Sequence, residues 1–97
     1  MNIYRFQGDA KGRNRCVEHG GLIYAVATAD GQDIQEQTRR SLKFLDESLE
    51  MAGSDKTRIV QGQIFLADIS QKAEMDVVWN EWIGPDWKNW PHRACVG

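Results

Sequence analysis

The sequence has few of the features that mark secreted or membrane-bound proteins. It carries only two cysteines, Cys16 and Cys95, and because small secreted domains usually hold a dense set of disulfides, both are expected to be reduced thiols. The longest apolar run, residues 22–27, is far shorter than the ~20 residues that cross a bilayer. The first residues also lack the apolar stretch of a signal peptide. These absences predict a cytoplasmic protein that does not bind membranes.

Charge of one sign is not concentrated anywhere in the chain. Twelve Lys and Arg residues stand against 14 Asp and Glu residues, for a net charge of −2, and the basic residues are scattered. Nucleic-acid binding needs a basic surface that neutralises successive phosphates, so no nucleic acid is expected as a partner. His19 and His92 are far apart and have no Cys or carboxylate at ligand spacing, so no metal site is predicted.

What the sequence does contain is enough apolar material for one small core. Of its 97 residues 41% are hydrophobic, and a chain of this length cannot form two separate cores. No internal repeat, linker or low-complexity segment divides it. Residues 1–97 are therefore predicted to form a single domain.

The N-terminal third predicts three strands. Residues 2–6 alternate polar and apolar, and residues 14–18 and 22–28 are separated by His19-Gly20-Gly21, whose glycines allow the positive φ angles of a tight hairpin turn. The run at residues 22–27 shows no polar alternation. Both of its faces are therefore expected to be buried, as in a central strand.

A long amphipathic helix is predicted next. Asp33 and Glu36 have the three-residue spacing of an N-terminal cap, and Gly53 is a typical residue at a helix end. Apolar or small residues between them recur at steps of three and four and form one stripe. They are Ile34, Thr38, Leu42, Leu45, Leu49 and Ala52.

The C-terminal half predicts a strand, a second helix and a last strand. In residues 58–67, Val60, Ile64 and Leu66 are expected on one face. A helix then begins at Asp68 or Ser70 and stops at Gly84-Pro85, because proline disfavours helical geometry in the residue before it. Its apolar stripe is the strongest helical signal in the chain and consists of Met75, Val78, Trp79, Trp82 and Ile83. Residues 92–97 read as a final strand.

These elements give the order β-β-β-α-β-α-β, which predicts an α+β fold with a mixed sheet and two helices packed on one face. The last strand stops at Gly97 without a turn signal or an evident closing partner. That ending suggests a C-terminal truncation.

Arg93 is the candidate for ligand binding, because its planar guanidinium can hold a carboxylate through two parallel hydrogen bonds. On a strand it shares a face with Cys95. The pattern alone leaves a second interpretation open, in which Arg93 is a surface arginine paired with an acid. Cys95 has no histidine or carboxylate partner that would activate it, so a buried structural thiol is the simpler interpretation. Trp87 and Trp90 could line a pocket, a subunit contact or the sheet edge.

Three segments, in the order in which they occur, resemble the Rid (YjgF-like) family, and most closely its YoaB-like branch. They are residues 33–42, residues 63–68 and the Pro-His-Arg-Ala-Cys-Val strand of residues 91–96. The resemblance implies a chorismate-mutase-like fold and a homotrimer with clefts between subunits. It also implies hydrolysis of enamine or imine intermediates, such as 2-aminoacrylate and 2-iminopropionate, to a 2-keto acid and ammonia, without a metal or organic cofactor.

The resemblance carries over to individual positions. Arg93 matches the family's carboxylate-binding arginine, and Cys95 matches a position whose backbone groups contact the substrate. Val26 and Ala27 stand where the family has a Ser-Gly pair, and Asp76 stands where it has an asparagine near the cleft. The substrate-binding set implied is therefore Arg93, Cys95, Val26, Ala27 and Asp76.

No catalytic residue is assigned, since the family's water-positioning glutamate lies on a strand beyond Gly97. Two functions follow as hypotheses, an imine deaminase and a protein that binds small 2-keto acids or other carboxylates in the same cleft without turnover.

Overall fold

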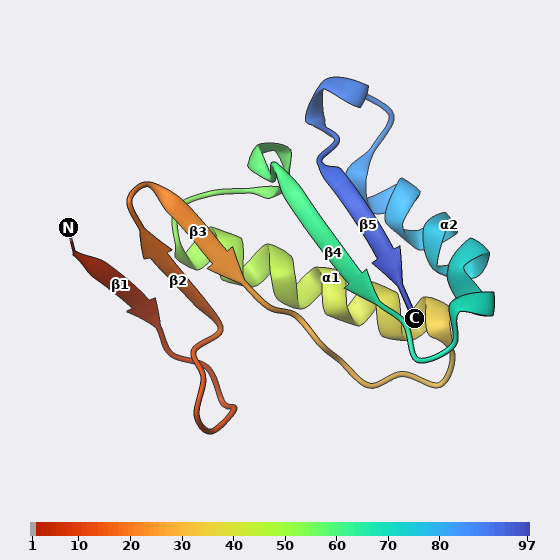
Figure 1. Cartoon of the computed structure of the whole chain (residues 1–97), viewed down its shortest axis with the longest axis horizontal. Coiled ribbons are helices and arrows are strands. Elements are labelled where there is room, and N and C mark those ends of the chain that lie inside the picture. The colour runs from red at the N-terminus through yellow and green to blue at the C-terminus, as the bar shows by residue number, and fades with distance from the viewer. Residues whose placement is uncertain (1) are drawn as a thin grey trace.

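The elements follow one another in the predicted order, in a computed structural model that describes residues 2–97 (Figure 1). The strands are β1 (Ile3–Phe6), β2 (Cys16–His19), β3 (Leu22–Ala25), β4 (Gln61–Phe65) and β5 (His92–Val96). The helices are α1 (Ile34–Met51) and α2 (Lys72–Ile83). Short 3₁₀ turns precede β4, α2 and β5, at Lys56–Arg58, Ile69–Gln71 and Trp87–Asn89.

The first three strands form an antiparallel meander. β1 pairs with β2, and β2 pairs with β3 through a tight hairpin. Gly20 and Gly21 at the tip have φ angles of 62° and 81°, the left-handed region that glycine enters without steric cost. The predicted hairpin is confirmed.

The last two strands form a parallel pair connected by α2. Gly62 lies opposite Arg93 and Ile64 lies opposite Cys95. Within the described residues the two pairings belong to separate hydrogen-bonded sheets, β1-β2-β3 and β4-β5. The α+β class is therefore confirmed, with antiparallel and parallel pairs both present but not joined in one continuous ladder.

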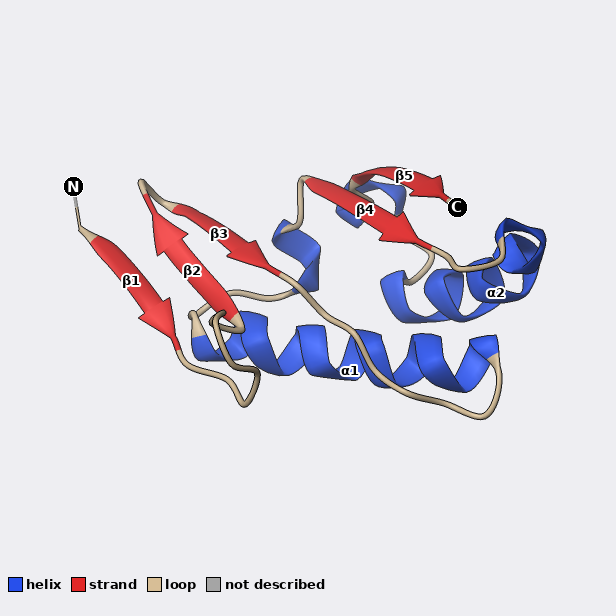
Figure 2. Ribbon diagram, turned by 60° about the horizontal axis from the view of Figure 1, so that its bottom comes forward, coloured by secondary structure: helices blue, strands red, loops and turns tan. Residues whose placement is uncertain are grey.

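Both helices lie on the same face of the strands, as Figure 2 shows. The core forms where α1, α2 and the inner face of β4 and β5 meet. Its buried members are Leu42, Leu66, Met75, Val78, Trp79 and Ile83. Partly buried side chains pack around them, namely Ile34, Leu45, Ile64, Trp82 and Cys95. The two predicted apolar stripes thus pack against each other, since most of these residues belong to them.

Aspartate side chains cap the start of α1 and the 3₁₀ turn that leads into α2. Asp33 Oδ1 accepts a hydrogen bond of 2.8 Å from the Glu36 N–H and so satisfies one of the free donors of the first turn of α1. Asp68 rather than Ser70 is the capping residue before α2, because its carboxylate accepts from the Ser70 N–H at 3.0 Å. The turn it caps is 3₁₀, and the α-helix itself begins at Lys72. None of the helices in residues 2–97 has the length and apolarity needed to span a membrane.

The prediction that β3 is a central strand buried on both faces is wrong for the single chain. β3 pairs only with β2, and Leu22 and Tyr24 remain 55% and 58% exposed. Both alternate along β3 with the partly buried Ile23, and in Figure 2 the helices lie on one face of the strands, with no described element on the other. An apolar run indicates that both faces of a strand can be buried, but it does not indicate whether the same chain or another one covers them.

The predicted strand at residues 58–67 is also longer than the real one. β4 begins only at Gln61, because Asp55 caps a 3₁₀ turn at Lys56–Arg58 through the Thr57 N–H. Val60 is therefore 75% exposed instead of lying on the inner face with Ile64 and Leu66. The strand predicted at residues 22–28 is likewise shorter, since β3 ends at Ala25.

Candidate functional site

Arg93 lies on the inner face of β5, where the strand passes over α2. Along β5 the even-numbered residues are exposed while Arg93 and Cys95 are partly buried, as the two-residue period predicts. The guanidinium carbon of Arg93 lies 5.1 Å from the centre of the Trp79 ring, within the range of a cation–π interaction. Since Trp79 belongs to the core, Arg93 rests on a rigid support.

Asp76 on α2 holds one arm of Arg93. Its Oδ1 accepts a hydrogen bond of 2.7 Å from Arg93 Nη2, and its Oδ2 accepts one of 2.6 Å from Lys72 Nζ. Burial raises the pKa of the Asp76 carboxyl, but the hydrogen bonds from Lys72 and Arg93 outweigh it and leave the pKa below its usual value. Asp76 is therefore ionised at neutral pH. Arg93 is thus paired with an acid, as one of the two interpretations expected. It also keeps donors that Asp76 does not use, as the other interpretation, a ligand-binding arginine, requires.

The second arm of Arg93 has no partner. Among the described residues, Arg93 Nη1 is the buried side-chain nitrogen or oxygen that makes no hydrogen bond. A buried donor without a partner costs about 1–3 kcal/mol, more for a charged group, so such atoms usually have a function or a ligand. A carboxylate oxygen that reached Nη1 would satisfy this donor, and the Arg93 side chain as a whole remains 18% exposed.

The cysteines differ in their surroundings, and both are free thiols. Cys95 follows Arg93 on the same face and is partly rather than fully buried at the edge of the core. Cys16 is fully buried, and its Sγ donates to the Ser48 carbonyl at 3.4 Å. Burial raises the pKa of the Cys16 thiol, which keeps it protonated and unreactive.

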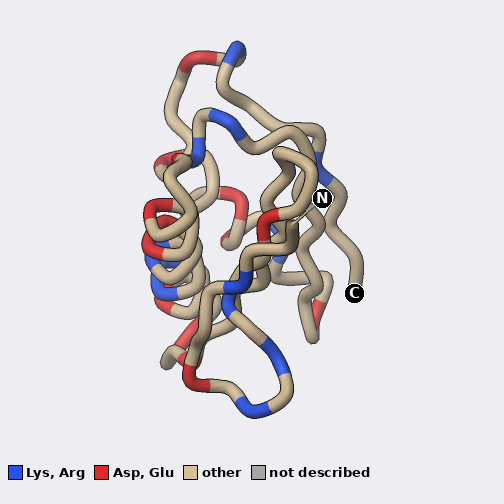
Figure 3. The backbone as a smooth tube through the Cα atoms, turned by 90° about the vertical axis from the view of Figure 1, so that its left-hand side faces the viewer, with Lys and Arg blue, Asp and Glu red and all other residues tan. Residues whose placement is uncertain are grey.

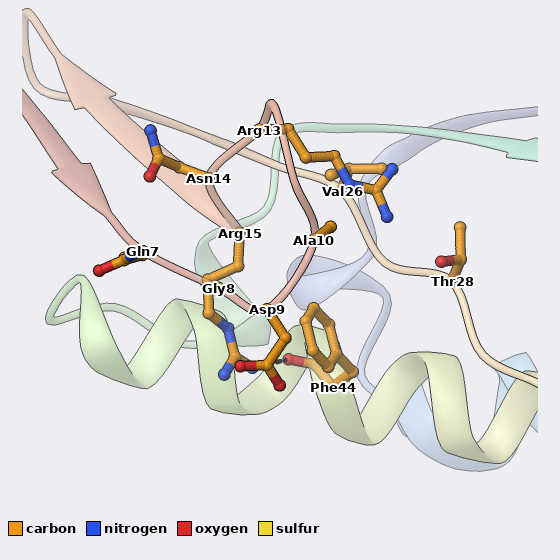
Figure 4. Close-up of a pocket in the computed structure, with 10 residues that line it drawn as sticks. All are labelled: Gln7, Gly8, Asp9, Ala10, Arg13, Asn14, Arg15, Val26, Thr28 and Phe44. Carbon is orange, nitrogen blue, oxygen red and sulfur yellow. Dashed lines mark hydrogen bonds between the residues drawn. The ribbon is translucent and has the colours of Figure 1, made fainter.

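Val26 lies in a different place, at a pocket of about 220 Å³ beside the β1–β2 loop. Val26 and Thr28, on the segment after β3, contribute to its wall together with Phe44 of α1 (Figure 4). Ala27 lies on the same segment. The pocket is not lined by Arg93, Cys95 or Asp76. The five candidate residues therefore fall into two groups, one at β5 and α2 and one after β3.

Arg15 is one of three charged residues that line this pocket, with Asp9 and Arg13, and its Nε and Nη2 donate within the chain. It donates to Ser48 Oγ at 2.8 Å and to the Phe44 carbonyl at 3.1 Å, and it lies 4.0 Å from the centre of the Phe44 ring. Figure 4 shows it reaching from the loop onto α1. Its contacts fasten the β1–β2 loop to α1, so we assign it a structural role.

Sequence reasoning missed two contributors to the Arg93 site. Lys72 precedes Asp76 by four residues, the spacing of a helical ion pair, and this signal was available in the sequence. The stacking of Arg93 on Trp79 was not, because it depends on how β5 crosses α2. Trp87 and Trp90 are exposed, and Trp90 Nε1 donates to the Gly84 carbonyl at 2.8 Å, so Trp90 fastens its loop to the end of α2.

Residues 9–97 match a family model described as endoribonuclease L-PSP. The RutC family protein YoaB of Escherichia coli is 33% identical over 85 residues, which cover 86% of this chain and 74% of that protein. A RutC family protein of Haemophilus influenzae is 40% identical over 65 residues, 67% of this chain and 54% of that protein. The chain thus spans about half the length of the second relative.

Solved structures agree with these matches. NMB1025 of Neisseria meningitidis, a member of the YjgF protein family, superposes with a TM-score of 0.88 at 34% identity and covers 99% of this chain and 80% of its own. Rv2704 of Mycobacterium tuberculosis, from the YjgF/YER057c/UK114 family, gives a TM-score of 0.85 at 26% identity, covering 99% and 83%. Both likenesses extend over β5 and α2, the elements that carry Arg93 and Asp76.

Proposed function

Because this chain belongs to the endoribonuclease L-PSP (Rid/YjgF) family and has its chorismate-mutase-like fold, we propose that it binds small 2-imino acids through Arg93 and hydrolyses them to 2-keto acids and ammonia. The observation that carries the proposal is the free, buried Nη1 of Arg93. It lies on a strand inside the matched region and supplies a charged donor that no residue from 2 to 97 uses.

Hydrolysis of an imine depends more on how the substrate and water are positioned than on reactive side chains. Water adds to the imine carbon, its protons pass to the nitrogen, and the tetrahedral adduct expels ammonia as the carbonyl forms. Arg93 would hold the carboxylate, and backbone groups at Cys95 would fix the nitrogen. Holding the ligand in this way lowers the entropic cost of the attack, and a fixed positive charge stabilises an anionic ligand in a partly desolvated site.

The test is the rate of ammonia release from 2-aminoacrylate generated in situ by a dehydratase. Ammonia release faster than the spontaneous hydrolysis is expected, with a rate that depends on the amount of protein. Loss of that acceleration in Arg93→Lys would tie it to the proposed site. An unaccelerated rate at every protein concentration contradicts the deaminase function.

A second candidate function is binding of 2-keto acids without turnover, and the ion pair at the site favours it. Asp76 already occupies one arm of Arg93, and no second acid–base group contacts Arg93 among the described residues. Saturable keto-acid binding together with an unaccelerated ammonia release would support this function over the first.

RNA is a weaker candidate ligand, although the matching family is described as an endoribonuclease. Figure 3 shows basic and acidic residues interleaved along the chain instead of a continuous basic stripe. The net charge of −2 gives no general attraction for phosphates.

The assembly we propose is a homotrimer. The strand face opposite the helices carries large exposed side chains, among them Leu22, Tyr24 and Phe65, and a face of this kind is usually covered by another subunit. Gel filtration coupled to light scattering is expected to give three times the 11.1 kDa of the chain. A mass near that of one chain at micromolar concentration would contradict the trimer.

A further inference from the structure

Three charged side chains meet where β5 crosses α2. Asp76 lies between Lys72 and Arg93 and gives one carboxylate oxygen to each. Among the described residues, no other charged side chain makes a hydrogen bond or ion pair with Arg93 or Asp76. The three residues together, which we call the Asp76 triad, carry a net charge of +1.

Asp76 occupies one of the two positions on the Arg93 guanidinium that a carboxylate ligand would use. A carboxylate ligand usually binds a guanidinium through two parallel hydrogen bonds, one to each arm. Asp76 uses only the Nη2 arm, at 2.7 Å, and leaves the buried Nη1 free. A ligand therefore either shares the guanidinium with an ionised Asp76 or displaces it from Nη2.

Lys72 makes either outcome possible without leaving Asp76 unpaired. The Lys72–Asp76 pair is one helical turn apart and lies within α2, so it does not depend on Arg93. Asp76 can therefore give up Nη2 and keep a partner at Oδ2. The negative charge nevertheless stays within a few ångströms of the ligand in both cases.

We propose that Asp76 sets the charge selectivity of the site, admitting monocarboxylates at Arg93 and discriminating against dicarboxylates. This inference rests on the proposed function, since it requires Arg93 to bind a carboxylate. One ligand charge is balanced by the +1 of the Asp76 triad. A second ligand charge has no balancing cation and is repelled by Asp76, in a partly buried site where like charges interact more strongly than in water.

2-Oxopentanoate and 2-oxoglutarate have the same chain length and differ in the second carboxylate, so comparing them isolates the effect of the second charge. Calorimetry on the whole chain should show that the wild type binds 2-oxopentanoate more tightly. In Asp76→Asn, which keeps the side-chain shape, 2-oxopentanoate is expected to bind about 5- to 10-fold more tightly and 2-oxoglutarate about 30-fold or more. The preference for the monocarboxylate should thus shrink by at least about threefold.

Glu74→Gln is the matched control, because it removes the same charge from an exposed position of α2 without touching Arg93. Its selectivity should equal that of the wild type. If Asp76→Asn folds poorly, as judged by its urea midpoint, Asp76→Ser carries the same expectation.

The outcomes separate the two proposals. Unchanged selectivity in Asp76→Asn, with binding still weakened in Arg93→Lys, overturns the role of Asp76 and leaves the proposed site intact. Equal changes in Asp76→Asn and Glu74→Gln also overturn it, because net charge alone would then explain them. If neither acid binds the wild type or Asp76→Asn, the proposed function fails and this inference fails with it.

Discussion

Replacing Arg93 with lysine is expected to weaken the binding of small 2-keto acids by about 1.5–3 kcal/mol, or about 10- to 150-fold. Lysine keeps the charge but has no planar pair of arms, so it cannot bond Asp76 with one nitrogen and a ligand with another in fixed geometry. Its ammonium would go to Asp76, whose Oδ1 now accepts from Arg93 Nη2. The loss of binding free energy therefore measures what the free arm of the guanidinium contributes to ligand binding.

Calorimetric titration with 2-oxobutanoate gives the affinity, and circular dichroism checks that the fold persists. Arg39→Lys is the matched control, because Arg39 is an exposed arginine of α1 whose side chain makes none of the hydrogen bonds or ion pairs found in the described residues. Equal affinities in wild type and Arg93→Lys would mean that Arg93 only ties β5 to α2 through Asp76.

Truncating Trp79 to alanine is expected to lower the free energy of unfolding by about 3–5 kcal/mol, the usual cost of removing a large aromatic side chain from a core. Trp79 is only 9% exposed, and its ring centre lies 5.2 Å from that of Trp82, which donates to Asp46 on α1 at 2.9 Å. The change thus opens a cavity between α2 and the β4–β5 pair, where the Trp79 ring lies beside Gly62 and Arg93. It also removes the ring beneath Arg93.

Urea unfolding followed by far-UV circular dichroism measures this effect. Trp87→Ala is the control, since Trp87 is 69% exposed and its loss should change the free energy of unfolding by less than about 0.5 kcal/mol. Similar losses in the two variants would mean that Trp79 is not a central core residue. Where Trp79→Ala remains folded, keto-acid affinity should also fall, because Arg93 loses its support.

The order of elements, the hairpin and the helix caps could be predicted from the sequence because each depends on local chemistry. Gly20 and Gly21 allow a turn that few other residues adopt, and the Asp33 carboxylate satisfies a donor only three residues away. Both helices end within two residues of the predicted glycines, Gly53 and Gly84, because the end of a helix is also set by local backbone conformation. The pairing of Arg93 and Cys95 on one face followed from the two-residue period of a strand.

The candidate site was predicted only in part. The residues of β5 were identified, and the importance of Arg93 came from three short segments that resemble a known family. Arg93 and Asp76 are 17 residues apart, and the loop with a 3₁₀ turn between α2 and β5 separates them. No short-range sequence pattern therefore predicts their contact. The family resemblance pointed to Asp76 as a residue near the cleft, but it did not predict that Asp76 contacts Arg93 and Lys72.

What the sequence determined by itself was therefore the set of elements, their caps and the inner face of each, because propensity, capping and periodicity act over a few residues. Only the tertiary structure decided which faces are covered and which charges meet. The apolar run of β3 looks central in the sequence, yet Leu22 and Tyr24 on it stay exposed because nothing in the described part of the chain packs on them. Asp76 and Arg93 form an ion pair because α2 packs beneath β5, and that contact depends on how distant segments fill one core.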